Sequence, residues 1–203
     1  MNGFTRDGIV APPMRTPLVQ TRRFTRAEYD RLTRQGFFDE DEPIELLDGL
    51  LVVKEPQGSA HVRMVSHVRR VLQRAFGERY DVLVRSPIAL DDASEPEPDL
   101  AVVRERPKDH LGSLPSSPVL LVEVADSSLR KDRREMAKLY ARNGIADYWI
   151  VNLVDRVLEV HRDPVRSSGG RWKYRSVRSL RPGAIVVPLA APRARLRVAD
   201  LLP

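Results

Sequence analysis

The sequence predicts an α/β or α+β domain, in which helices pack against a β-sheet. Short apolar runs of strand length recur along the chain, and they alternate with segments that repeat apolar residues at helical spacing. The chain has 203 residues, of which 42% are hydrophobic and 31% are charged, so it is long enough to bury one full core. We expect a flexible arm over residues 1–20, which show no periodic pattern, and a single domain over residues 21–203.

The first part of this domain is predicted to contain a helix, a hairpin and a second helix. Thr25 is the expected N-cap of a short helix, because Glu28 three residues later completes a capping box. The Asp-Gly dipeptide at 48–49 divides two apolar runs, IELL and LLVV, and is typical of a hairpin turn. Apolar residues at helical spacing then predict a helix over about 60–76.

The rest of the chain is predicted to form strands and one further helix. A helix over about 129–143 follows two serines that are candidate caps, and an Asn-Gly pair closes it. Apolar runs separated by turn-forming residues predict the strands. These runs are VLVRSPIAL (82–90), DLAVV (99–103), VLLVEVA (119–125), DYWIVNL (147–153), RVLEVHRD (156–163), WKYRSV (172–177) and AIVVPL (184–189).

Charge is distributed unevenly along the chain. The net charge is +6, and residues 156–203 carry 11 Lys and Arg against 3 Asp and Glu. Such a basic segment suggests an anionic partner such as nucleic acid. The absence of cysteine excludes a disulfide scaffold, a thiolate zinc site and a cysteine nucleophile. The N-terminus lacks the apolar stretch of a signal peptide and no segment approaches ~18 apolar residues, so we expect a cytoplasmic protein without a membrane span.

Two acidic residues stand at unusual positions. Asp99 opens the apolar run DLAVV, and Glu123 lies inside the apolar run VLLVEVA. A carboxylate inside an apolar strand is costly unless it is paired or holds a cation. If the two strands are neighbours, both carboxylates can ligate one Mg²⁺, which prefers one or two carboxylates with water and phosphate oxygens. The alternative is structural: Asp99 caps a loop and Glu123 faces solvent on an edge strand.

Several segments resemble the Uma-two family of endonucleases, within the restriction-endonuclease-like nucleases. The matching segments are IELLDG, SEPEPDLAVV, LVEVADSSL, GIADYWIV and VLEVHRDP, and the resemblance covers roughly residues 21–203. It implies a mixed central sheet flanked by helices, here with an N-terminal hairpin and extra C-terminal strands, often assembled as a homodimer. It also implies DNA as the substrate and Mg²⁺ or Mn²⁺ as the cofactor. Asp99 and Glu123 would be the metal ligands, Glu45 a further acidic member of the site, and His61 a close neighbour.

The chain departs from the pattern of these nucleases at the expected lysine. The signature places a lysine two residues after the second acid, where this chain has Ala125. Members of this family are expected to carry it on the following helix instead, where this chain has Met136. The ammonium positions the attacking water and stabilises the charge that develops on phosphate. Neither residue can supply that cation.

Few residues are available to replace this lysine, because the chain has only five lysines. Lys138 is the nearest in sequence and is the first candidate, although two residues turn a helix by ~200° and place it on a different face from position 136. Lys131 opens the helix near the two acid-bearing strands, and a local irregularity could aim it inward. Arg130 could stabilise phosphate charge but could not act as a base.

Three functional hypotheses follow. The first is a metal-dependent endonuclease that cleaves DNA phosphodiester bonds through Asp99 and Glu123. The second is a nuclease fold that has lost its chemistry and serves as a DNA-binding or assembly module, which the missing lysine suggests. The third is a purely protein-binding domain. The sequence shows no Gly-rich phosphate loop, no Ser-His-Asp order and no nucleotide-binding fingerprint, which argues against kinases, triad hydrolases and dehydrogenases.

Overall fold

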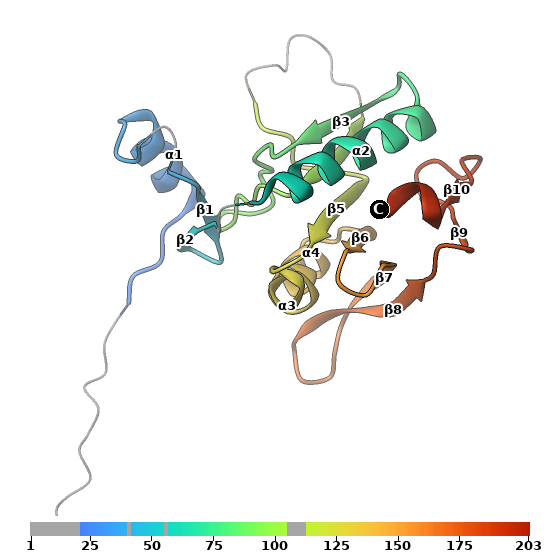
Figure 1. Cartoon of the computed structure of the whole chain (residues 1–203). Coiled ribbons are helices and arrows are strands. Elements are labelled where there is room, and N and C mark those ends of the chain that lie inside the picture. Colours follow the sequence, from blue (N-terminus) through green and yellow to red (C-terminus); the bar gives the residue numbers. More distant parts are fainter. Residues whose placement is uncertain (1–20, 40–41, 55–56, 105–112) are drawn as a thin grey trace, which may run out of the picture.

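The centre of the molecule is a six-stranded sheet (Figure 1). The computed structural model describes residues 21–39, 42–54, 57–104 and 113–203, so the arm expected over residues 1–20 lies outside the described part. The strand order is β3-β4-β5-β6-β7-β8, in which β5 and β6 are parallel and all other neighbours are antiparallel. The strands are β3 (Tyr80–Val84), β4 (Leu100–Arg104), β5 (Leu120–Ala125), β6 (Asp147–Asn152), β7 (Val157–Arg166) and β8 (Trp172–Leu180).

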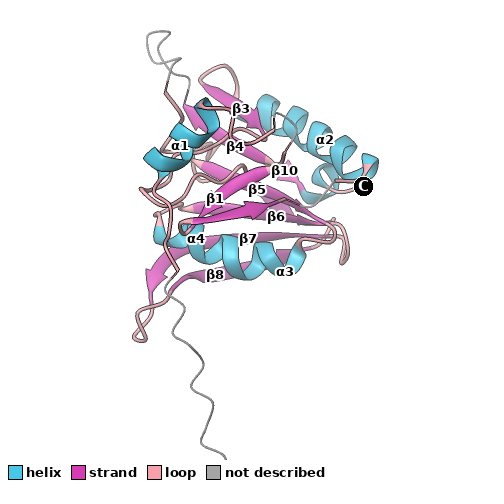
Figure 2. Cartoon of the chain, turned by 90° about the vertical axis from the view of Figure 1, so that its left-hand side faces the viewer, coloured by secondary structure: helices cyan, strands magenta, loops and turns pink. Residues whose placement is uncertain are grey.

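Helices cover both faces of this sheet, which confirms the predicted class. The long helix α2 packs over the β3–β5 half on one face, and a shorter helical segment lies across the β6–β8 half on the other (Figure 2). The amphipathic pattern of α2 explains its position, because its buried residues recur at helical spacing. The bounds are α2 (Ser59–Phe76), α3 (Leu129–Lys131), the π-helix η2 (Asp132–Met136) and α4 (Ala137–Arg142).

The alternation of side chains along the central strands divides the core into two layers. Leu100 and Val102 of β4 belong to the layer under α2, whereas Ala101 between them belongs to the layer under α4. The same pleat operates on β5, where Leu121 packs in the α4 layer. Glu123 is two residues further along β5, so the pleat turns its side chain toward the α4 layer as well. This register places a carboxylate at the edge of an apolar layer.

A helix and a hairpin form an N-terminal module, here residues 21–54, beside the sheet. The capping box at Thr25 and Glu28 is present and opens the helix as predicted. Asp48 and Gly49 both have positive φ, 51° and 78°, which is the turn that matches the twist of a two-residue hairpin. A Cβ on Gly49 would lie 2.6 Å from Cβ of Arg23, so only glycine fits there. The elements are α1 (Arg26–Arg34), β1 (Ile44–Leu47) and β2 (Leu50–Val53).

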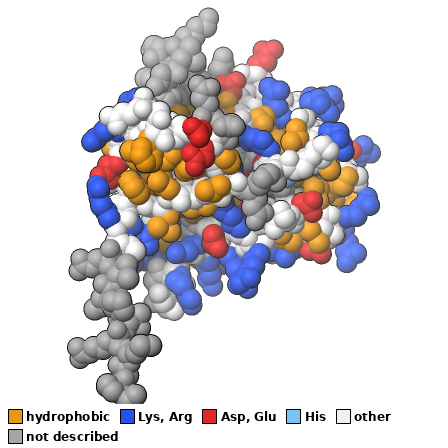
Figure 3. Space-filling model, turned by 60° about the vertical axis from the view of Figure 1, so that its left-hand side comes forward, with side chains coloured by type: hydrophobic (Ala, Val, Ile, Leu, Met, Phe, Trp, Pro, Cys, Tyr) orange, Lys and Arg blue, Asp and Glu red, His pale blue; other side chains and the backbone are white. Residues whose placement is uncertain are grey.

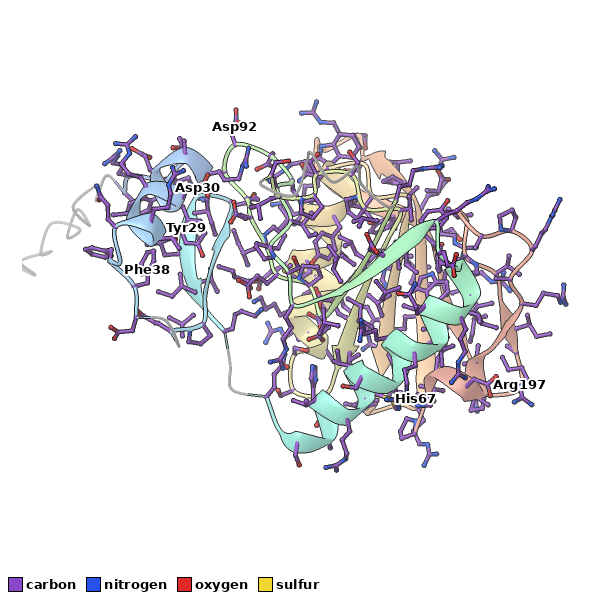
Figure 4. All side chains as sticks on the ribbon, turned by 90° about the horizontal axis from the view of Figure 1, so that it is seen from above. Tyr29, Asp30, Phe38, His67, Asp92 and Arg197 are labelled. Carbon is purple, nitrogen blue, oxygen red and sulfur yellow. The ribbon has the colours of Figure 1, made fainter. Side chains whose placement is uncertain are left out.

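Hydrogen bonds hold the module together and attach it to the rest of the molecule. The hydroxyl of Tyr29, which points from α1 toward the hairpin (Figure 4), donates to the carbonyl oxygen of Ile44 at 2.9 Å. The backbone N–H of Glu95 donates to the carbonyl oxygen of Leu46 at 2.8 Å. The segment that leads into β4 therefore runs alongside β1, and this brings the hairpin close to the start of β4.

The structure differs from the sequence-based expectation at three places. The strand expected over 82–90 ends at Val84, because Arg85 adopts a positive φ of 44° that breaks the extended backbone. The helix expected over 129–143 contains a π-helix. The run at 184–189 gives only a two-residue strand, β9. The C-terminal elements are β9 (Ile185–Val186), β10 (Leu196–Arg197) and the 3-10 helix η3 (Val198–Leu201).

Candidate functional site

A cavity of about 530 Å³ opens where the N-terminal hairpin, the start of α2, strand β5 and helix α3 meet. It is lined by Glu45, His61, Asp99 and Glu123, so the structure brings four of the five predicted site residues together. Four acidic side chains of its wall are between 2% and 8% exposed. We call these residues the acidic cluster: Glu45, Asp99, Glu123 and Asp132.

Three different segments fix the orientation of Asp99. Its Oδ1 accepts a hydrogen bond from Nε2 of Gln57 at 3.2 Å, and lies 3.0 Å from Nε2 of His61 at the start of α2. Its Oδ2 accepts from the backbone N–H of Val124 on β5 at 2.9 Å. In the tautomer that carries its proton on Nε2, His61 donates to Asp99 in this contact. His61 therefore supports the position of Asp99.

Glu123 lies directly beside Asp99. Its Oε2 accepts from the backbone N–H of Asp99 at 3.1 Å, and its Oε1 accepts from the hydroxyl of Tyr140 at 2.8 Å. Burial raises the pKa of this carboxyl group well above its ordinary value, and the charges of Asp99 and Asp132 raise it further. A cation that enters the cavity therefore stabilises the ionised form of Glu123.

Asp132 completes the acidic cluster from the first position of the π-helix. Its Oδ2 accepts from the hydroxyl of Ser128 at 2.6 Å. Burial raises the pKa of Asp132 to about 6; the hydrogen bond from Ser128 acts against this rise, and the charge of Asp99 adds to it. The cluster therefore concentrates more negative charge than its protein surroundings neutralise.

The ammonium group of Lys131 lies at the acidic cluster. Nζ of Lys131 is 2.8 Å from Oε1 of Glu45, and Oε2 of Glu45 accepts from the backbone N–H of Glu97 at 3.2 Å. Burial by itself lowers the pKa of Lys131, but the attraction of Glu45 outweighs it, and the pKa lies above its ordinary value. Lys131 is therefore charged at neutral pH.

The π-helix explains why Lys131 faces the cavity. In an α-helix, residues five apart point in directions that differ by about 140°. A π-turn instead closes between residues five apart, and the backbone N–H of Ala137 bonds to the carbonyl oxygen of Asp132 in this way. Lys131 and Met136, which are also five apart, consequently both line the cavity. The extra residue in the turn is the local irregularity that could aim Lys131 inward.

Comparisons with known proteins identify the family and the fold of this chain. Residues 26–199 match the model of the family Uma2, whose description is "Putative restriction endonuclease". The chain belongs to this family. Its fold is similar to that of a protein of Anabaena variabilis described as a putative nuclease, with a TM-score of 0.60 and 17% identity, covering 84% of this chain and 96% of that one. No curated protein matches the chain. The resemblance seen in the sequence is confirmed, and family and fold are nuclease-like.

The structure does not bring Lys138 to this Uma2 site. Lys138 is exposed on α4 and is not among the residues that line the cavity. Arg130 lines the cavity from an exposed position, and Lys131 reaches furthest toward the acidic cluster. Ala125 is fully buried at the end of β5, where it packs in the α4 layer.

Sequence reasoning assigned no site role to three residues of the cavity and its surroundings. Gln57 and Tyr140 hold Asp99 and Glu123, and Asp132 belongs to the acidic cluster. Asp132 carries a recognisable signal, because it follows Ser128 at a spacing that allows a side-chain hydrogen bond within a helical turn. Gln57 and Tyr140 carry no such signal, since their roles arise only when distant segments meet.

The donor set fits a cation held by two carboxylates. In the described ranges, no three His, Asp or Glu side chains are grouped so as to ligate one ion together. Asp99 and Glu123 are adjacent and oriented, which matches the preference of Mg²⁺ for one or two carboxylates and several waters. Oε1 of Gln57 is buried beside Asp99 and has no hydrogen-bond partner among the described residues. A hydrated ion would supply one.

Proposed function

We propose that this Uma2 protein is an endonuclease that hydrolyses DNA phosphodiester bonds with Mg²⁺ or Mn²⁺. The supporting observation is the acidic cluster, in which four buried carboxylates face one cavity and Lys131 pairs with one of them, Glu45. Burying several negative charges together lowers the stability of the folded protein, and a bound divalent cation offsets this destabilisation. The raised pKa of Glu123 is the physical sign of this imbalance.

Asp99 and Glu123 would hold the ion, and Glu45 completes the acidic wall. When bound, a divalent ion supplies Lewis acidity toward phosphate and lowers the pKa of a water molecule. The chain's own residues prepare the ligands: His61 and the N–H of Val124 orient Asp99, and Tyr140 orients Glu123. Outer contacts of this kind commonly tune metal affinity by 10- to 100-fold.

DNA is the proposed partner, and the basic C-terminal segment is its proposed contact surface. β8 is the last strand of the sheet and presents Lys173, Arg175 and Arg178 as exposed side chains. Exposed arginines contact phosphate without reading sequence. We propose that this segment supplies affinity, while the acidic cluster supplies cleavage.

We further propose a homodimer and a cytoplasmic location. Phe37, Leu50 and Val53 of the N-terminal module are 70%, 49% and 65% exposed. Figure 3 shows hydrophobic side chains gathered on the side of the molecule that carries this module. A second copy could cover this surface. Light scattering after size exclusion on the wild type and on Phe37→Ser tests the homodimer.

A cysteine-free chain suits a reducing compartment, and no helix in the described ranges is long and apolar enough to cross a membrane.

The second candidate function is a lapsed nuclease that binds DNA without cutting it. Met136 favours it, because this residue lines the cavity at the position where the family is expected to carry lysine. If the wild type is inert with every divalent metal and Met136→Lys confers cleavage, the protein belongs to this second class.

A plasmid-nicking assay tests the first candidate. We expect the wild type to nick supercoiled plasmid with Mg²⁺ or Mn²⁺ and not in EDTA. Asp99→Asn and Glu123→Gln, which preserve shape and remove charge, should abolish nicking, whereas Glu78→Gln at an exposed position should not. Cleavage by both site variants at the wild-type rate would refute the proposal.

A further inference from the structure

A protein cation in a nuclease site stabilises the negative charge that develops on the phosphate during hydrolysis. Three basic residues line this cavity, namely Lys54, Arg130 and Lys131. Nζ of Lys54 is engaged by Glu97, at 3.0 Å to its carbonyl oxygen and 3.1 Å to its carboxylate. Arg130 has an exposed side chain. Among the lysines and arginines that the structure describes at this cavity, Lys131 is the one whose charged group pairs with a member of the acidic cluster.

The side chain of Lys131 is held in place and does not extend freely into water. It is 33% exposed, while its partner Glu45 is 3% exposed. Glu45 is itself fixed by the backbone N–H of Glu97, so the carboxylate that receives the ammonium has a defined position. The charges of Glu123 and Asp132 also act on Lys131, which places the ammonium within electrostatic reach of the rest of the cluster.

We propose that Lys131 is the catalytic cation of this site, and that Glu45 is a positioning residue that holds its ammonium beside the scissile phosphate. This inference rests on the proposed endonuclease function. Hydrolysis forms one P–O bond from water and breaks one bridging P–O bond, and one proton of the water ends on the leaving oxygen. The negative charge that develops on the phosphate oxygens meets the ammonium of Lys131, which donates hydrogen bonds to it.

Three members of the acidic cluster have separate roles in this proposal. Glu45 is the member whose carboxylate is paired with the ammonium of Lys131, and it also accepts from the N–H of Glu97, so we assign it to the lysine and not to the metal. Asp99 and Glu123 keep the metal. The lysine that the family pattern places at 136 is supplied from 131, because the π-turn brings both positions to the same cavity.

The first test compares Lys131→Met with Lys138→Met, which make the same change at two positions of one helical segment. We expect Lys131→Met to lower kcat by on the order of 10²–10³, the usual loss for one removed charge-stabilising donor. Lys138→Met should stay within about twofold of wild type. Lys131→Arg should recover part of the loss, because it restores the charge with a different shape.

The second test measures binding without turnover. Mn²⁺ affinity by calorimetry should be unchanged or tighter in Lys131→Met, since the variant keeps both ligands and loses a competing positive charge. Affinity for a fluorescein-labelled 20-base-pair duplex in Ca²⁺ should fall about tenfold, as expected for one charge-assisted contact. Weaker Mn²⁺ binding in this variant would show that Lys131 only maintains the metal site, and would overturn the inference.

The third test moves the cation. In the Lys131→Met background, adding Met136→Lys should raise the cleavage rate at least tenfold above that of Lys131→Met alone, because both positions line the cavity. A double variant that melts like wild type and stays inactive would contradict the inference. If the wild type cleaves DNA and Lys131→Met cleaves it at the same rate, the role proposed for Lys131 is overturned and the endonuclease function stands. An inert wild type would overturn the endonuclease function, and the inference with it.

Discussion

Asp132→Asn is predicted to stabilise the metal-free protein at neutral pH. The pKa of Asp132 rises to about 6 on folding, chiefly through burial, from an ordinary value of 3.8. A shift of about two units corresponds to about 3 kcal/mol, which the folded state loses as pH rises and the group ionises. The variant escapes this loss but weakens the hydrogen bond from Ser128, at a cost of about 1 kcal/mol. We therefore expect a net gain of about 2 kcal/mol at pH 7.5.

Thermal melts in EDTA between pH 4 and pH 7.5 test this prediction. Because the folded-state pKa is raised, the stability that protonation supplies is complete below 3.8 and lost as pH rises through about 6. Asp132→Asn should melt about 4–8 °C above the wild type at pH 7.5, and the gap should close toward pH 4. Glu78→Gln, at an exposed position, is the matched control. A gap that is absent or independent of pH would refute the reasoning that the cluster stores unfavourable charge.

Three further predictions concern the scaffold and the DNA surface. Although burial acts to raise it, the neighbouring imidazole of His161 and hydrogen bonds from Arg133 and Asn152 lower the pKa of Glu159 to about 2. Glu159→Gln should thus destabilise the protein by on the order of 2–3 kcal/mol at pH 7, with the difference fading in melts as pH falls below 4.5 toward 2. Gly49→Ala should lower stability by about 1–3 kcal/mol in urea unfolding, because its φ of 78° and the close backbone leave no room for a Cβ; an unchanged midpoint would argue against the turn. Replacing two exposed arginines of 156–203 by glutamine should reduce the salt slope of DNA binding by about 2, and an unchanged slope would exclude this segment from phosphate contact.

The fold could be predicted well wherever local pattern and tertiary structure agree. The helix at 59–76 has a strong apolar period, and the hairpin has an Asp-Gly turn, one of the few residue pairs that favour this backbone. The strand that was expected to reach residue 90 ends earlier because of the positive φ of Arg85, and arginine gives no warning of that conformation. The sequence singled out Asp99 and Glu123 on the condition that their strands are neighbours, and the structure places β4 beside β5.

The remaining parts of the site depend on geometry that no local pattern encodes. A regular helix places Lys131 and Met136 on different sides, and only the π-turn brings both to the cavity. Glu45 and Lys131 are 86 residues apart in the sequence and meet because the hairpin packs beside the start of β4. Lys138 was the nearest candidate by sequence distance, and proximity along a helix does not imply a shared face.

The central claim is that Asp99 and Glu123 together hold the metal ion on which cleavage depends. The most direct measurement is a calorimetric titration of Mn²⁺ into the wild type, Asp99→Asn and Glu123→Gln, run beside Mn²⁺-dependent plasmid nicking by the same preparations. The account predicts one Mn²⁺ per wild-type chain, and the loss of binding and nicking together in both folded variants. Wild-type Mn²⁺ affinity or wild-type nicking in either variant would contradict it.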